Sequence, residues 1–360
     1  MCLRRAVIPR NDSGSFNLLL SGVYLTAQVN TFKDSSGRPS VLLSACQSVV
    51  KNAKLHLSGG ASWFYNLFAG FLEEPIKHNV NEKLCPRVNE ALAILQRELD
   101  TFQVISQLDA KNEIDYSLVH PPRVEKTHID LELKGSVHPV GSSRNDLFPE
   151  IHINLPNERT SMVYIGLSEY FFNSIGKNYF TMNTLKLVLT HEQFPHAFWL
   201  RTGDYGTIIP KIKHHYPQSQ AMELVITATK APMVTVTPQN ITMEMTGLLQ
   251  GMVVLPYLVT SQVFSVNMVA TLIADKVQLS GLNLVVSFVV ERYKFHEFKS
   301  SVGYINVAEL ESALDHSLRE SVLREINDRL QKGIPMPALG NISLQDPAVT
   351  ITQASINVRP

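Results

Sequence analysis

The segment 62–103 constrains the fold most, because it carries a long helical pattern in a chain whose other segments mostly have strand patterns. Its apolar residues recur every three to four positions, at Trp63, Leu67, Phe71, Ile76, Val80, Leu84, Val88, Leu92, Leu95 and Leu99. This spacing places one continuous apolar stripe on a helix. Pro75 and Pro86 lie inside the segment. Because proline removes a backbone donor, we expect kinks or two to three helical pieces.

The first turns of this helix are apolar nearly all round, with Trp63, Phe64, Tyr65, Leu67, Phe68, Phe71 and Leu72. A helix of this kind is buried, or it touches something apolar that is not water. A core helix is the simpler interpretation. The alternative is a helix that lines an apolar ligand cavity, and a long helix lying on a twisted antiparallel sheet builds either arrangement.

Strand patterns flank the helix on both sides. Residues 16–29 predict a strand with a bulge or bend at Gly22. Residues 34–39 contain Gly and Pro and predict a turn, and 40–45 and 49–57 are expected to pair across it as antiparallel strands. After the helix, residues 114–119 and 128–133 also predict strands.

A segment low in apolar residues and rich in Pro, Gly and Ser divides the chain at 138–150. We therefore predict domains at 1–137 and 151–360, joined by this linker. The second domain is expected to contain a helix at 168–179, strands from 222 to 291, a helix at 307–332 and a final strand at 349–358. The apolar stripe of the 307–332 helix consists of Leu310, Leu314, Leu318, Val322, Ile326 and Leu330.

The charges exclude a general attraction to nucleic acid, because 32 Lys and Arg balance 32 Asp and Glu. Residues 1–54 differ, with seven basic and two acidic side chains. This excess is a solvated surface or a site for an anionic partner. No stretch approaches the roughly 18–20 apolar residues of a membrane span. No signal peptide is visible after Met1, since no apolar run follows the basic residues.

Catalytic and metal-binding motifs are not found in the sequence, so we predict no catalytic residue, metal site or cofactor. Thr190-His191-Glu192 begins like a zinc-protease helix, but Pro195 stands at the fifth position and the second histidine is His196. His214 and His215 are neighbours whose side chains would point about 100° apart on a helix. We interpret both as surface residues.

The three cysteines are Cys2, Cys46 and Cys85, and no Cys-x-x-Cys pair occurs. A disulfide between Cys46 and Cys85 would close a loop of about 40 residues and stabilise the chain by about 4 kcal/mol in the chain-entropy model. Two unpaired buried thiols are the alternative, and the residues alone leave both open. Candidate N-glycosylation sites are Asn11, Asn240 and Asn341.

Three segments together resemble the bactericidal/permeability-increasing and lipopolysaccharide-binding protein family. They are Asp115-Tyr-Ser-Leu-Val119 before Pro121-Pro122, the segment 162–173, and the segment 326–337 that ends in Lys-Gly-Ile-Pro-Met-Pro. The resemblance implies an α+β fold of two domains, each a twisted antiparallel β-barrel packed with long helices. A central sheet would join them in an elongated boomerang. Nothing before Phe16 resembles the family's opening helix and strands, so we expect a truncated first domain, with the signal peptide lost in the missing section.

The resemblance also implies a function and its residues. Cys46 and Cys85 would form the family's single disulfide, with Cys2 free. The protein would be secreted, glycosylated and non-catalytic, and would bind phospholipid, and lipopolysaccharide or the bacterial outer membrane surface, in innate antibacterial defence. A lipid-transfer or carrier protein without antibacterial activity is the alternative. The implied lipid-binding residues are Trp63, Leu67, Phe71, Leu84, Val88, Tyr170, Phe171, Leu314 and Leu318.

Overall fold

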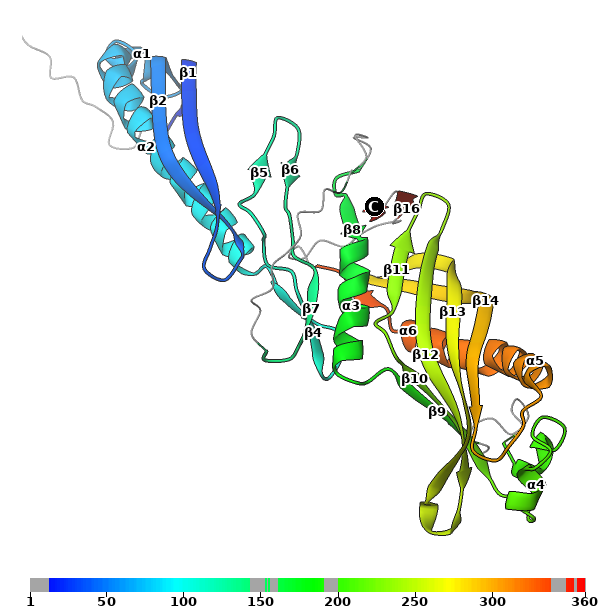
Figure 1. Cartoon of the computed structure of the whole chain (residues 1–360). Coiled ribbons are helices and arrows are strands. Elements are labelled where there is room, and N and C mark those ends of the chain that lie inside the picture. The colour runs from blue at the N-terminus through cyan, green and yellow to red at the C-terminus, as the bar shows by residue number, and fades with distance from the viewer. Residues whose placement is uncertain are drawn as a thin grey trace, which may run out of the picture. The chain divides into compact units, whose positions relative to one another are not determined.

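A computed structural model describes residues 13–142, 153, 155, 161–190, 200–337, 348–352 and 355–359. It is a mixed α+β structure whose sheets are antiparallel (Figure 1). Contacts within the chain define two compact units, which we call unit 1 (Met1–Phe102 and Leu118–Leu133) and unit 2 (Gln103–Ser117 and Lys134–Pro360). Most of the predicted linker lies outside the described residues, so the predicted domain limits stay a prediction.

Unit 1 is built on a long hairpin of β1 (Ser15–Lys33) and β2 (Pro39–Ser58). The predicted turn at 34–39 is confirmed, since Asp34 Oδ1 accepts the Ser36 and Arg38 amide hydrogens at 2.8 Å each. The prediction of separate strands at 40–45 and 49–57 is wrong, because β2 runs through both without a break. The pairing register shifts at Gln28/Val29. Gly22 adopts a φ of 62°, a conformation that glycine accepts without strain.

The predicted long helix forms as two pieces, α1 (Ser62–Tyr65) and α2 (Ala69–Asp100). The break falls before Ala69, and both prolines lie within α2. Asn66 occupies the break, and its side-chain amide exchanges two hydrogen bonds of 2.8 Å with the backbone of Leu57. Pro75 and Pro86 are exposed, so water can bond the carbonyl groups that each proline leaves without a helical donor.

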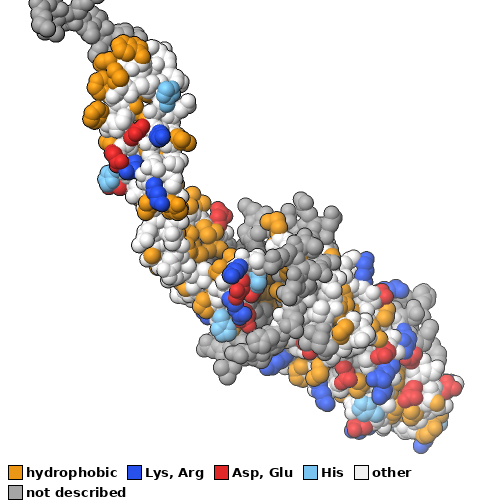
Figure 2. Space-filling model, turned by 90° about the horizontal axis from the view of Figure 1, so that it is seen from above, with side chains coloured by type: hydrophobic (Ala, Val, Ile, Leu, Met, Phe, Trp, Pro, Cys, Tyr) orange, Lys and Arg blue, Asp and Glu red, His pale blue; other side chains and the backbone are white. Residues whose placement is uncertain are grey.

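The buried hydrophobic core of unit 1 is small. Among its described residues it consists of Val50, Ala53, Ala69, Phe102 and Leu118. Many other hydrophobic side chains reach the surface, and Figure 2 shows them (orange) gathered at the end of unit 1 that carries α1. A hairpin and one helix bury too little apolar area to be stable without further links. The remaining strands of the unit, β5 (Arg123–Val124) and β6 (Ile129–Asp130), are exposed and short.

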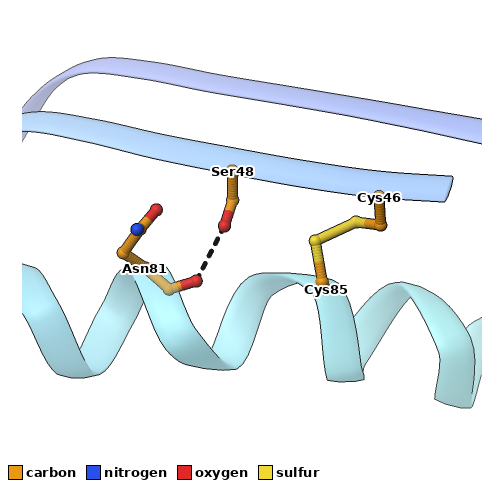
Figure 3. Close-up of a disulfide and its surroundings, with 4 residues drawn as sticks. All are labelled: Cys46, Ser48, Asn81 and Cys85. Atoms are coloured by element: carbon orange, nitrogen blue, oxygen red, sulfur yellow. Dashed lines mark hydrogen bonds between the residues drawn. A yellow bond between two sulfur atoms is a disulfide. The ribbon is translucent and has the colours of Figure 1, made fainter.

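One covalent link holds α2 on β2, because Cys46 on β2 and Cys85 on α2 form a disulfide with 5.8 Å between their Cα atoms (Figure 3). The predicted pairing is confirmed, and Cys2 lies outside the described residues. Next to the disulfide, the Ser48 hydroxyl donates to the Asn81 carbonyl at 2.7 Å (Figure 3). The bond closes a loop of 39 residues, so it removes much of the freedom of the unfolded unit.

Unit 2 is organised around a seven-stranded sheet, with the strand order β15-β14-β13-β12-β10-β9 and β11 paired to β12. The strands are β9 (Lys186–Thr190), β10 (Met222–Ala228), β11 (Met233–Val236), β12 (Ile241–Val254), β13 (Thr260–Ser280), β14 (Asn283–Ser300) and β15 (Ile334–Pro335). Two short helices, η1 (Thr202–Tyr205) and α4 (Ile212–His215), follow β9.

The predicted helix at 307–332 packs on this sheet as α5 (Val307–Ser317), a π-helical segment (Leu318–Val322) and α6 (Leu323–Leu330). Its stripe is buried at Leu310, Leu314, Leu318 and Val322. Apolar residues at a constant spacing of four move about 40° around an α-helix with each step. The wider π turn counters this drift and keeps the stripe on the sheet.

A second helix of unit 2, α3 (Glu169–Thr181), confirms the predicted helix at 168–179. It packs on a three-stranded sheet of β3 (Ile105–Gln107), β4 (Asn112–Asp115) and β7 (Ser136–Pro139). Tyr116 stacks on Phe171 with ring centroids 6.3 Å apart, and its hydroxyl donates to the Pro335 carbonyl at 2.6 Å. The resemblance motif at 115–119 therefore contains a core residue of unit 2.

The predicted final strand at 349–358 is wrong in part, because two strands are found there. They are β16 (Ala348–Thr352) and β17 (Ser355–Arg359), which pair as a hairpin, and β17 also pairs with β8 (Ile165–Ser168). A run of apolar residues at alternating positions does not reveal a reversal of the chain within it.

We expect removal of the disulfide to destabilise unit 1 more than any other single change. Replacing Cys46 and Cys85 with serine should lower the free energy of unfolding of unit 1 by about 4 kcal/mol, because the unfolded loop regains its freedom. Urea denaturation of the purified protein would measure the change, with Cys2→Ser as the matched control. Equal denaturation midpoints for the double variant and the control would contradict the prediction.

A buried ion pair in unit 2 should stabilise the fold at neutral pH and lose this effect in acid. Asp115 is buried beside Lys134, with 3.2 Å between Oδ2 and Nζ. Burial alone would raise the pKa of Asp115, but hydrogen bonds from Ser117 and the charge of Lys134 lower it below the ordinary value. A carboxyl with a depressed pKa stabilises the fold above its unfolded pKa of about 3.9, and this stabilisation is lost as the pH falls through the folded pKa.

Asp115→Asn should therefore cost about 1.5–3 kcal/mol at pH 7 and progressively less below about pH 4. Urea denaturation at both pH values would measure this difference. Asp130→Asn, at a carboxylate that is 41% exposed and 3.6 Å from His128, is the control and should change stability little at either pH. The same destabilisation by Asp115→Asn at pH 7 and in acid would be incompatible with this account.

Candidate functional site

The two faces of the unit 1 hairpin differ in chemistry. Cys46 and Ser48 of β2 face α2, because one forms the disulfide and the other bonds a helix carbonyl. Cross-strand partners lie on the same face of a sheet, so Ala27 and Leu25, opposite Cys46 and Ser48, also face the helix side. Val50 and Ala53, which lie opposite Val23 and Leu20, are both buried, so the alternation changes phase at Gly22, where φ is 62°. The helix-side face of β1 therefore consists of seven apolar residues, Phe16, Leu18, Leu20, Val23, Leu25, Ala27 and Val29. We call these seven residues the β1 strip.

Helix α2 covers β2 and leaves the β1 strip open. Three of the backbone N–H groups of β2 bond side chains of the helical segment: Val41 to Gln96 Oε1 at 2.8 Å, Leu55 to Glu73 Oε1 at 3.1 Å, and Leu57 to Asn66 Oδ1 at 2.8 Å. These bonds hold the helix along the outer edge of β2. They also protect that edge from pairing with other strands.

The β1 strip is consequently exposed although it is apolar. Phe16 is 66% exposed, and Leu18, Val23, Leu25 and Val29 are also exposed. The opposite face of β1 is mostly polar, with Asn17, Ser21, Thr26, Gln28 and Asn30, and it also carries the exposed Leu19 and Tyr24. Burying one Leu or Val side chain is worth about 1.5–3 kcal/mol, so the strip strongly favours an apolar partner.

The first helical turns add a second exposed apolar surface in the same unit. Trp63 is 73% and Phe71 77% exposed, and Leu67 is also exposed. Aromatic rings contact one another along this surface, with centroids 5.3 Å apart for Phe64 and Phe68. Three of the predicted lipid-binding residues are thus exposed in this segment: Trp63 in α1, Leu67 between the two helices and Phe71 in α2.

The other predicted lipid-binding residues lie elsewhere. Leu84 and Val88 are half-buried further along α2. In unit 2, Tyr170 is half-buried, and Phe171, Leu314 and Leu318 are buried in packing contacts within the unit. The β1 strip is not among the predicted lipid-binding residues. Apolar residues that alternate at 16–20 and again at 23–29 were the sequence signal for it.

A shallow groove in unit 2 has a different character. It has a volume of about 300 Å³ and is lined by Lys276, Gln278, Ser280, Val285, Ser287 and Gln331. Five of these side chains are polar, which does not suit the apolar chains of a lipid.

The paired histidines and the candidate glycosylation sites are partly among the described residues. His214 and His215 are exposed, as predicted, while residues 191–196 lie outside the described residues. Within the described chain no cluster of His, Cys, Asp and Glu could hold a metal ion. Asn240 is half-buried in the turn before β12, and Asn11 and Asn341 are not among the described residues.

The described helices include none that is long and apolar enough to span a bilayer.

Comparison with known proteins matches residues 106–359 to the LBP / BPI / CETP family, C-terminal domain, and residues 8–97 to its N-terminal domain. The chain is 32% identical to a bactericidal permeability-increasing protein of Sebastes schlegelii, over 92% of this chain and 70% of that protein. It is 30% identical to the human BPI fold-containing family C protein, over 90% of this chain and 64% of that protein.

The fold is also similar to a crystal structure of lipopolysaccharide binding protein, with a TM-score of 0.59 and 26% identity over 96% of this chain and 75% of that one. The chain thus spans about two thirds of the length of the sequence relatives it matches. Because the two domain matches together cover most of the chain, and the fold agrees with them, the chain belongs to the LBP / BPI / CETP family.

Proposed function

We propose that this protein is an extracellular lipid-binding protein that holds lipid acyl chains against the β1 strip and the exposed turns of α1 and α2. The observation that carries the proposal is the bare apolar face of β1, because acyl chains can supply the apolar cover that α2 does not. Binding of this kind needs no bond making or breaking, so the protein acts without catalysis. The Cys46–Cys85 disulfide supports secretion, because such bonds persist in oxidising compartments.

The charge of the hairpin favours an anionic lipid. Neither β1 nor β2 contains Asp or Glu, and Lys51 and Lys54 are exposed on β2. Lys51 lies over the Tyr24 ring, with 4.9 Å between Nζ and the ring centroid, on the face opposite the β1 strip. Its charge would attract an anionic lipid to unit 1 without contacting the acyl chains. Phospholipid and lipopolysaccharide both combine acyl chains with phosphate groups, and lipopolysaccharide is in the name of several relatives. A role in innate antibacterial defence follows if lipopolysaccharide is bound.

A carrier of lipid without antibacterial activity is the second candidate. The balance of 32 basic and 32 acidic residues favours it, because a neutral protein has no general attraction to the anionic surface of a bacterium. Killing of Gram-negative bacteria by the purified protein supports defence. Transfer of phospholipid between vesicles without killing supports the carrier.

Substitutions on the two faces of the hairpin test the proposed lipid site. Leu18→Thr with Leu25→Thr makes the β1 strip more polar and keeps the strand preference of the sequence. Lipid affinity should fall about tenfold or more, because two apolar contacts of about 1 kcal/mol each are lost. Binding of a phospholipid with a fluorescent acyl chain would measure it, in parallel with lipopolysaccharide.

The matched control is Leu19→Thr with Val49→Thr, which changes two exposed apolar residues on the opposite face of the same hairpin. This variant should bind lipid as the unchanged protein does. Equal affinity losses for the two double variants would show that hairpin stability, and not the β1 strip, governs binding.

A further inference from the structure

The hairpin between β12 and β13 ends in an unusual tip. The Leu255 amide donates to the Val259 carbonyl at 2.8 Å and closes a loop of three residues, η2 (Pro256–Leu258). Tyr257 and Leu258 have φ angles of 66° and 59°, a left-handed region in which side chains other than those of Gly and Asn are strained. They are also 99% and 86% exposed. Two large apolar side chains thus project into solvent from positions that favour glycine.

The same end of unit 2 presents basic side chains. The segment from η1 to α4 leads into β10, and Ala221 accepts the Val254 amide hydrogen at 2.8 Å beside the hairpin. Ile208, Ile209 and Ile212 anchor this segment, since all three are fully buried. Lys211, Lys213, His214 and His215 then point outward. Figure 1 shows α4 and the β12–β13 tip at the same end of unit 2.

Among the residues that the structure describes, no contact neutralises the two lysines of this segment. Within the described residues, Lys211 and Lys213 form no ion pair. Residues 200–221 contain Arg201, Lys211 and Lys213 but only one acidic residue, Asp204. The segment therefore attracts anions.

We propose that this end of unit 2 docks on the surface of an anionic phospholipid bilayer. Tyr257 and Leu258 insert at the boundary between headgroups and acyl chains, where an aromatic ring with a polar edge is favoured. Lys211 and Lys213 lie near the headgroup phosphates, where each basic residue adds attraction.

A protein partner fits this surface less well. A stable protein interface buries roughly 800 Å² on each side. A tip of three residues is too narrow to supply such an area, whereas a bilayer accepts a narrow apolar wedge. The docking site is separate from the β1 strip of unit 1, and the proposal does not depend on the function proposed above.

Vesicle sedimentation tests the proposal with the full chain. Vesicles of equal parts phosphatidylcholine and phosphatidylserine are compared with vesicles of phosphatidylcholine alone. Tyr257→Asn with Leu258→Gly removes the wedge and introduces residues that accept a positive φ, so the hairpin keeps its fold. This variant should bind the mixed vesicles about tenfold more weakly.

Two further variants complete the test. Met162→Thr with Met233→Thr removes two exposed apolar side chains elsewhere on unit 2 and should bind as the unchanged protein does. Lys211→Gln with Lys213→Gln should weaken binding to the mixed vesicles only. In a protein that already carries Leu18→Thr and Leu25→Thr in unit 1, the tip substitutions should weaken vesicle binding by the same factor as in the unchanged protein.

Several results would overturn the proposal. They are unchanged vesicle binding by the tip variant, no binding by the unchanged protein, and an equal loss in the methionine control. Equal affinity of the unchanged protein for both kinds of vesicle would also overturn it, because the basic segment would then contact no phosphate.

Discussion

The position of α2 over β2, and not over β1, determines which apolar surface unit 1 exposes. The disulfide, the Ser48 contact and the bonds from Asn66, Glu73 and Gln96 hold the helix along one strand. The other strand is left with an apolar face and no cover from the helix. A sheet with one polar and one apolar face normally buries the apolar one, so unit 1 is a structure that an apolar ligand would complete.

In unit 2, the apolar stripe of the long helix is buried against the unit's own sheet. Its long helix carries a stripe with a strict spacing of four, and the π-helical segment lets that stripe stay on the sheet. Leu314 and Leu318 are consequently core residues, although they share the helical pattern of Trp63 and Phe71. The same sequence pattern thus produced a closed core in one unit and an open apolar surface in the other.

Sequence reasoning succeeded where local patterns and motifs decide the structure. The stripes of the long helices, the turn at 34–39 and the family were all recognisable from the residues themselves. It failed where contacts distant in sequence decide. The helix breaks at Asn66 because that side chain bonds Leu57, and no helical propensity reveals such a bond. Alternation in 16–29 predicts two faces of a strand, but it does not say which face another element will cover.

The exposed tip of η2 was invisible to the sequence analysis for a similar reason. Tyr257 and Leu258 give no turn signal in the sequence, because tyrosine and leucine disfavour a positive φ. The long pairing of β12 with β13 imposes that conformation on them. The strain is thus a consequence of register, which is a property of the folded sheet.

The central claim is that lipid acyl chains lie on the β1 strip. The most direct measurement is photo-crosslinking with a phospholipid whose acyl chain carries a photoreactive group, followed by mapping of the linked peptides by mass spectrometry. The account predicts crosslinks within Ser15–Lys33, at the residues of the strip, and in the adjoining turns around Trp63 and Phe71. Crosslinks confined to unit 2, or to the polar face of β1, would contradict it.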